Sequence, residues 1–148
     1  EKLQMVFDEG LYDPANEPDI AYAYLFSHFR GEEWRTQKET RRLLDKYFTT
    51  APDGIPGNDD TGTMSAWAVF TMLGLYPDCP GEPYYTLTAP VFDRAEIDTD
   101  GGTLVIEKRG EGYIRKMTLG DKPLTKYRVG HDELLRGGKL TFELKNER

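Results

Sequence analysis

Two adjacent aspartates stand in a glycine-bracketed turn directly before an apolar segment. The stretch PGNDDTGTMSAW (residues 56–67) places Asn58, Asp59 and Asp60 between two glycines and then runs into apolar sequence. Unpaired amides and the macrodipole at a helix N-terminus favour anions, so we expect at least one carboxylate here to stay ionised. An ionised carboxylate can act as a general base or a calcium ligand, but helix capping explains the same pattern.

A second group of oxygen donors lies earlier in the chain. PANEPD (residues 14–19) gathers Asn16, Glu17 and Asp19 around Pro18, again before apolar sequence. Two such groups suggest that both helix N-termini open on one side of a helical barrel. Oxygen ligands without Cys or His favour calcium over zinc. Two unrelated helix caps remain the alternative.

Other chemically capable side chains have mainly structural interpretations. His28, His131 and Trp67 fit local structure or core packing better than a site. Trp34 is equally suited to packing or to stacking on a sugar ring. Cys79 has no cationic neighbour in sequence to activate it, so it is not expected to be a nucleophile.

The elements that must position these groups are helical in the first half. Residues 17–29 are apolar on nearly every side, which predicts a buried helix. Residues 32–48 predict a surface helix with an apolar stripe, and residues 64–73 predict a buried helix ended by Gly74. Three helices, two of them nearly all apolar, cannot cover one another, so we expect a larger helical assembly.

The second half changes to strands after the Pro-rich stretch at residues 76–83. Two-residue alternation and turn chemistry predict an antiparallel sandwich of five to seven strands, with one helical turn within residues 130–138. The predicted strands are 103–108, 112–119 and 139–144, and the predicted turns are 98–102, 120–123 and 136–138. The fold class is therefore α+β, with units 1–80 and 81–148.

Composition excludes several classes of function. The 148 residues carry a net charge of -7 without a basic cluster, so we expect no nucleic-acid partner. No apolar run reaches the roughly 20 residues that cross a membrane, so no membrane association is expected. A single cysteine excludes an internal disulfide. The chain opens at Glu1 without a leader, and we expect a fragment of a longer protein.

Several motifs in order resemble a known family. These are ANEPDIAYAYLF, EEWRTQ, GIPGNDDTGTMSAWAVFTMLGLYP, YYTLTAPVF and GHDELLRGGKLTFEL. Together they are similar to the C-terminal third of glycoside hydrolase family 92, the calcium-dependent exo-acting α-mannosidases. The resemblance implies that residues 1–80 are the last helices of an (α/α)6 catalytic barrel and residues 81–148 a small antiparallel β-sandwich. It also implies upstream domains as partners and a secreted or periplasmic protein.

The resemblance further implies an inverting hydrolysis of terminal mannose on glycans. We expect α-1,2 linkages, but the resemblance itself transfers no linkage preference, because the paired histidines that some relatives carry between Ile20 and Tyr24 are absent here. Asp60 would be the general base, and Asn58 and Asp59 would orient the water or Asp60. Glu17 would contact Ca²⁺ or mannose, with Asn16 beside it as a second metal ligand and Trp34 as a substrate contact. The general acid belongs to an upstream motif with no match here, so we expect the isolated chain to be inactive.

Two other functions compete with this interpretation. The strand half could be a carbohydrate-binding or structural module without catalysis. The helices could equally belong to another (α/α)6 hydrolase that acts on glucosides.

Overall fold

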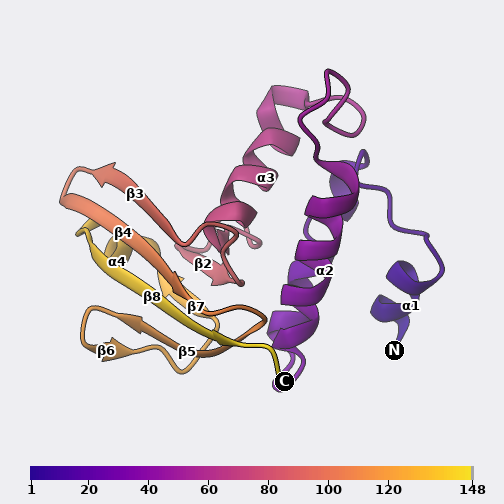
Figure 1. Ribbon diagram of the computed structural model, residues 1–148. Coiled ribbons are helices and arrows are strands. Elements are labelled where there is room, and N and C mark those ends of the chain that lie inside the picture. Colours follow the sequence, from indigo (N-terminus) through magenta and orange to yellow (C-terminus); the bar gives the residue numbers. More distant parts are fainter. Residues whose placement is uncertain (148) are drawn as a thin grey trace. The chain divides into compact units, whose positions relative to one another are not determined.

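The computed structural model describes residues 1–147 and divides into two compact units (Figure 1). The helical unit is Glu1–Val69 and the sheet unit is Phe70–Arg148. The division falls inside helix α3 (Thr63–Leu73). The boundary expected at residue 80 lies later in the chain, where the sequence changes from helical to strand patterns. Helical segments precede most of the strands, as the sequence predicts.

The helical unit is built from short segments around two longer helices. Its elements are α1 (Lys2–Asp8), η1 (Glu17–Asp19), η2 (Tyr22–His28), α2 (Glu33–Tyr47), η3 (Asp60–Gly62) and the first part of α3. Helix α1 was not predicted from the sequence. It is held by Phe7, which stacks on Tyr12 with ring centroids 5.2 Å apart and contacts Phe26 at 5.8 Å.

The prediction of one buried helix over residues 17–29 is wrong. The segment forms two 3₁₀ helices, η1 and η2, closed by bonds such as Tyr24 N–H to Ala21 C=O at 2.9 Å. Aromatic residues lose side-chain freedom in an α-helix, and the three-residue period of a 3₁₀ helix puts Ala23 and Phe26 on one buried side. The far end is exposed, with Phe29 59% accessible.

Helix α2 is confirmed as an amphipathic surface helix. Leu43 and Leu44 are buried, and the buried side continues toward the N-terminus through polar residues: Thr36, Gln37, Glu39 and Thr40. The buried Glu39 carboxylate accepts from Arg42 Nε at 2.7 Å and from Gln4 Nε2 at 3.2 Å. This pairing satisfies a charge that would otherwise be costly to bury.

Helix α3 forms where predicted, and Gly74 ends it with φ of +85°. The prediction that it is buried is only partly right, because Ala66 is exposed and Val69 is 56% exposed. A Cβ at residue 74 would lie 2.8 Å from Pro90 Cγ and 2.9 Å from the Thr88 carbonyl oxygen. Trp67, only 1% exposed, stacks on Phe48 at 5.4 Å and meets Tyr24 edge-on at 6.4 Å. Trp67 is therefore a core residue, as its place in the helix predicts.

The sheet unit contains two sheets. One has the strand order β1-β2-β7, and the other has the order β3-β4-β8-β5-β6. The strands are β1 (Leu75–Tyr76), β2 (Tyr84–Leu87), β3 (Arg94–Thr99), β4 (Gly102–Arg109), β5 (Tyr113–Leu119), β6 (Lys122–Pro123), β7 (Arg128–Gly130) and β8 (Gly138–Lys145). The helical turn expected between strands is α4 (His131–Leu135), which begins after Gly130.

The larger sheet is not wholly antiparallel, which corrects the prediction. Strand β8 lies between β4 and β5; it pairs antiparallel with β5 and parallel with β4. The β4–β5 connection passes over the end of β8, where Cβ atoms on Gly110 and Gly112 would lie 2.5 Å and 2.3 Å from the Leu144 and Lys145 carbonyl oxygens. Only glycine fits at these two positions of the connection. The consecutive strands β4 and β5 flank β8 and do not pair with each other.

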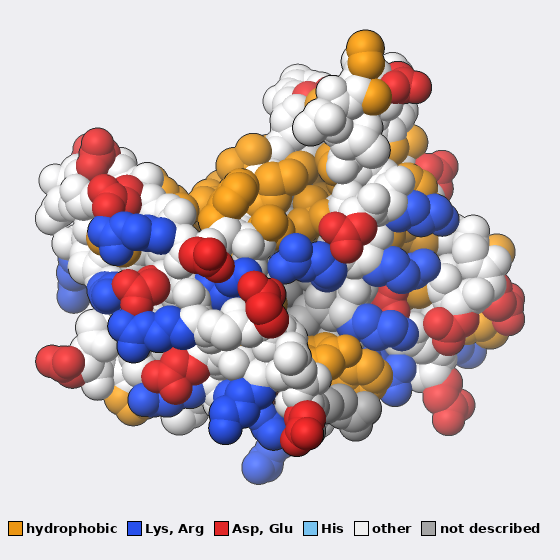
Figure 2. All heavy atoms as spheres, in the orientation of Figure 1, with side chains coloured by type: hydrophobic (Ala, Val, Ile, Leu, Met, Phe, Trp, Pro, Cys, Tyr) orange, Lys and Arg blue, Asp and Glu red, His pale blue; other side chains and the backbone are white. Residues whose placement is uncertain are grey.

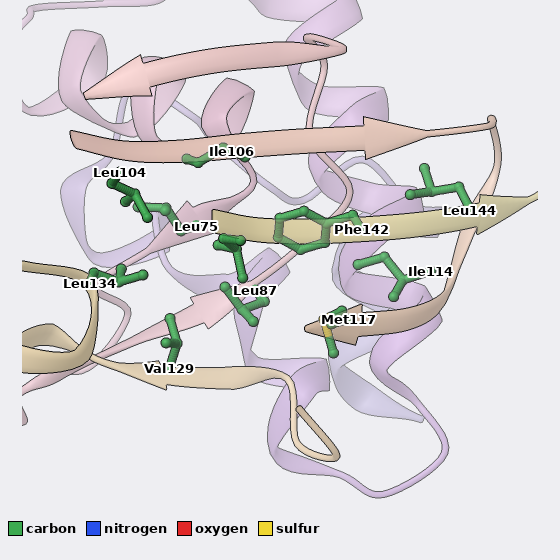
Figure 3. Packing of buried hydrophobic residues seen from close by; sticks show 11 residues of the cluster. Leu75, Leu87, Leu104, Ile106, Ile114, Met117, Val129, Leu134, Phe142 and Leu144 are labelled. Atoms are coloured by element: carbon green, nitrogen blue, oxygen red, sulfur yellow. The ribbon is translucent and has the colours of Figure 1, made fainter. Parts of the chain in front are cut away.

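The two sheets share one hydrophobic cluster (Figure 3). Figure 3 shows Ile106, Phe142 and Met117 from the larger sheet together with Leu87 and Val129 from the smaller one. Leu87, Leu140 and Phe142 are completely buried. The cluster makes the sheet unit a folded body with its own core.

Charges of both signs are interspersed on the face seen in Figure 2. Several are paired, as in Lys139 to Glu107 and Lys122 to Glu133, both at 2.5 Å. Among the helices of residues 1–147, none has the length and apolar character needed to span a bilayer.

Candidate functional site

The aspartate loop before α3 is a tight and partly strained turn. Gly57 and Gly62 have φ of +61° and +80°, and Thr61, which is not glycine, has φ of +51°. The Asp60 carbonyl oxygen accepts from the Thr61 hydroxyl at 2.8 Å and from the Thr63 hydroxyl at 2.5 Å. The backbone at Asp60 is therefore fixed by its neighbours.

Asp59 is engaged by the helix that follows it. Its Oδ1 accepts from the Ser65 N–H at 2.8 Å, and its Oδ2 accepts from the Ser65 hydroxyl. The Ser65 hydroxyl first, and the Ser65 amide second, lower the pKa of the Asp59 carboxyl below its ordinary value. Asp59 therefore serves as a cap of α3, and both of its oxygens are used.

Asp60 and Asn58 differ from Asp59 in having available side chains. Both are exposed, and within residues 1–147 neither the Asp60 carboxylate nor the Asn58 amide has a hydrogen-bond or ion-pair partner. The two adjacent aspartates thus have different environments. Both carboxylate oxygens of Asp59 accept hydrogen bonds from Ser65. Asp60 is held through its backbone carbonyl, and its carboxylate is exposed.

The second predicted group forms a loop of its own. Asp13 Oδ1 accepts from the Ala15 N–H at 2.9 Å, and Asp19 Oδ2 accepts from the Asp13 N–H at 3.3 Å. Asn16 precedes η1, and Glu17 is its first residue. Both are exposed, and neither side chain has a hydrogen-bond partner within the described residues.

The structure brings the two loops together at Gly57. A Cβ built on Gly57 would lie 2.4 Å from Ala15 Cβ and 3.2 Å from Ala15 Cα. Glycine is thus required at residue 57 by close approach as well as by its positive φ. Ala15 immediately precedes Asn16 and Glu17, and Gly57 immediately precedes Asn58, so both predicted groups flank one contact.

Replacing Gly57 by alanine is expected to destabilise this arrangement strongly. The new methyl would clash with Ala15, and the left-handed backbone alone costs an alanine roughly 1–2 kcal/mol. Gly10→Ala is the matched control, because Gly10 has φ of +70° and a Cβ added there would meet no atom within 4 Å. Thermal unfolding should show a clearly larger loss for Gly57→Ala; equal losses would contradict the close contact.

Trp34, the predicted substrate contact, lies on helix α2. It stands in the first turn of α2, and the Arg35 guanidinium covers its ring at 4.8 Å from the centroid. A hollow of about 1080 Å³ opens between α1 and the start of α2, but its lining includes neither of the acid-bearing loops. Arg35, on its wall, already pairs with Gln4 Oε1 at 2.7 Å.

A metal centre complete in itself is not found in the described part of the chain. Within residues 1–147, no three His, Cys, Asp or Glu side chains gather closely enough to hold an ion. Glu17 and Asn16 can supply two oxygen donors, whereas calcium takes about six to eight.

Ser65, which binds Asp59, is a residue of this loop that the sequence did not single out. It appears in the sequence only as a polar member of an apolar helix, and its partner lies six residues away across a turn. One signal was available: Ser65 is the third residue of α3, and a side chain that caps a helix accepts a hydrogen bond from the backbone N–H at the second or third position.

The pKa of Asp59 makes the stability of this loop dependent on pH. Because its folded-state pKa lies below the ordinary 3.8, ionised Asp59 contributes stability that is present above about pH 4 and is lost as the pH falls through the folded-state pKa. Asp59→Asn should therefore cost more stability near neutral pH than in acid. Thermal unfolding at both pH values tests this, with the exposed Asp53→Asn as control; a pH-independent difference for Asp59→Asn would contradict it.

Comparison with known proteins gives consistent relatives. Residues 1–146 match the family model described as the glycosyl hydrolase family 92 catalytic domain. A protein of Arthroderma benhamiae, named an uncharacterized secreted glycosidase, is 30% identical over 154 residues, covering 99% of this chain and 20% of that protein.

Two solved structures from Bacteroides thetaiotaomicron are also similar. The family GH92 α-mannosidase BT3965 is 29% identical with a TM-score of 0.86, over 93% of this chain and 19% of that one. The family GH92 inverting mannosidase BT2199 is 31% identical with a TM-score of 0.81, over 97% of this chain and 20% of that one. The chain thus spans about a fifth of the length of these relatives. Because the family model matches nearly the whole length of this chain, the chain belongs to glycosyl hydrolase family 92.

Proposed function

We propose that this chain forms the base side of the active site in an inverting exo-α-mannosidase that removes terminal mannose from glycans. Membership of the family supports a glycoside hydrolase, and the likeness to the inverting mannosidase BT2199 supports the stereochemistry. On the same likeness, the helical unit would be the last part of an (α/α)6 barrel. We take α-1,2 linkages as the first substrates to test.

Asp60 is the proposed general base. Its carboxylate is exposed and unpartnered within residues 1–147, while its backbone carbonyl is held by the Thr61 and Thr63 hydroxyls. A carboxylate so placed can accept a proton from water as the water attacks the sugar. Inversion needs a general acid about 6.5–9.5 Å away across the sugar, and we assign that group to another part of the complete protein.

The observation that carries the proposal is the contact between Gly57 and Ala15. It sets the loop of Asp60 beside the loop of Glu17, two segments about forty positions apart in sequence. A water-activating carboxylate and a group that binds sugar hydroxyls or metal must lie close together in such an enzyme. Two unrelated helix caps would not require this close approach.

Calcium is the proposed cofactor, with Glu17 and Asn16 among its ligands. Their exposed and unpartnered oxygens fit a hard cation, but two donors fill only part of its coordination. Sugar hydroxyls, water and other parts of the complete protein would supply the rest. When bound, the ion would hold mannose hydroxyls and support the ring distortion that the transition state requires.

Location and partners follow the same likeness. Since the relative from Arthroderma benhamiae is named a secreted glycosidase, we propose that this protein also acts outside the cytoplasm. Its partners would be mannose-containing glycans and the other domains of its own complete chain.

The decisive experiment compares α-mannosides with α-glucosides as substrates of the complete protein, before and after calcium is removed with a chelator. We expect hydrolysis of mannosides only, lost on chelation and restored by Ca²⁺, and no turnover by residues 1–148 alone. Preference for glucosides would favour another (α/α)6 hydrolase. Absence of any hydrolysis, with glycan binding retained, would favour a carbohydrate-binding module.

A further inference from the structure

We infer that Ser65 is a positioning residue, which holds Asp59 so that the neighbouring Asp60 carboxylate is presented to the substrate. This inference rests on the proposed function of Asp60. Ser65 itself touches neither substrate nor metal in this account.

Ser65 binds the Asp59 carboxylate through two hydrogen bonds. One residue supplies both donors: its amide to Oδ1 at 2.8 Å and its hydroxyl to Oδ2. Two hydrogen bonds to a carboxylate fix its plane as well as its position, which a single bond does not. The start of the loop is thereby tied to Ser65, the third residue of helix α3.

The loop between Asp59 and Ser65 is strained. Thr61 has φ of +51°, a conformation that costs a side chain with a branched Cβ, and Gly62 follows at +80°. Such a turn persists only where its surroundings hold it. Asp60 lies between the anchored Asp59 and the strained Thr61, so the direction of its Cα–Cβ bond depends on the anchor.

The adjacent carboxylates of Asp59 and Asp60 have different roles. The donors at the start of α3 compensate the charge of Asp59, because both of its oxygens accept hydrogen bonds. Asp60 keeps its oxygens free for a water molecule. The two neighbouring acids therefore have separate roles: Asp59 holds the loop, and Asp60 is left open to a water molecule.

The test is steady-state kinetics of the complete enzyme with Ser65→Ala, Ser65→Thr and Ser27→Ala. Ser27 is the matched control, because its hydroxyl also bonds a side chain, Thr36 Oγ1 at 2.9 Å, outside both loops. Misplacing a reacting group by about 1 Å can cost about 100-fold in rate. We expect Ser65→Ala to lower kcat about 10- to 100-fold with KM nearly unchanged, Ser65→Thr to restore most of it, and Ser27→Ala to keep wild-type kcat.

A second variant keeps the inference falsifiable if Ser65→Ala does not fold. An asparagine at residue 59 can still accept from the Ser65 amide and bond its hydroxyl, so Asp59→Asn should retain kcat within about tenfold, whereas Asp60→Asn should not. Equal losses for these two variants, or wild-type kcat in Ser65→Ala, would overturn the inference while leaving Asp60 as base. Wild-type enzyme inactive on every α-mannoside would instead defeat the proposed function.

Discussion

Asp60→Asn is expected to lower kcat of the complete enzyme on α-mannosides by about 10²–10⁴-fold, with little change in KM. The amide is close in shape to the carboxylate but cannot take a proton from water. The Asp60 side chain has no partner within the described residues, so its replacement should leave the fold intact. Initial rates over a range of substrate concentrations measure both constants.

The matched control is Asp45→Asn, which removes an exposed carboxylate from α2. It should leave both constants unchanged. If Asp60→Asn kept more than about a tenth of wild-type kcat while Asp45→Asn behaved as expected, Asp60 would not be the base.

Trp67→Ala is expected to have the largest effect on stability. The side chain is 1% exposed, stacks on Phe48 and meets Tyr24, so its removal leaves a large cavity between α3 and the rest of the helical unit. Truncating a buried Trp costs about 3–5 kcal/mol, out of the roughly 5–15 kcal/mol by which domains are stable. Urea unfolding followed by circular dichroism measures the loss.

Trp67→Phe separates ring packing from hydrogen bonding. The buried Nε1–H of Trp67 has no hydrogen-bond acceptor among the residues that the structure describes. Phenylalanine keeps an aromatic ring at the contact and removes this unpaired donor, so its cost should be clearly smaller than that of alanine. A loss for Trp67→Phe as large as for Trp67→Ala would contradict this account of the core.

The elements with a strong and regular pattern were predictable from the sequence. Helix α2, helix α3 with its Gly74 end, and the strands β4, β5 and β8 all lie where periodicity and turn residues indicated. In α2 and the three strands the local preference agrees with the burial found in the fold, whereas α3 leaves the apolar Ala66 and Val69 exposed. A sequence pattern predicts an element correctly where local preference and tertiary packing favour the same structure.

Features that depend on distant contacts were not predictable. The apolar run at residues 17–29 predicts one α-helix, but it forms the two 3₁₀ helices η1 and η2, and Tyr22, Tyr24 and Phe26 lie in η2. The parallel β4–β8 pair follows from the insertion of the last strand between two consecutive ones, which alternation cannot reveal. Helix α1 is too short to signal itself, because a seven-residue helix depends on packing for its stability.

The candidate site divides in the same way. The acids themselves were visible as Asn58, Asp59 and Asp60 before an apolar helix. Which of the two aspartates is free was not, because that depends on Ser65 reaching back across the turn. The contact of Gly57 with Ala15 is likewise a tertiary fact.

The most direct test of Asp60 as the base uses α-mannosyl fluoride as substrate. Fluoride departs without help from a general acid, so hydrolysis of this substrate still needs the general base but not the general acid. We predict that Asp60→Ala in the complete enzyme loses hydrolysis of the fluoride as severely as that of ordinary α-mannosides. Cleavage of the fluoride by Asp60→Ala at close to the wild-type rate would contradict the account.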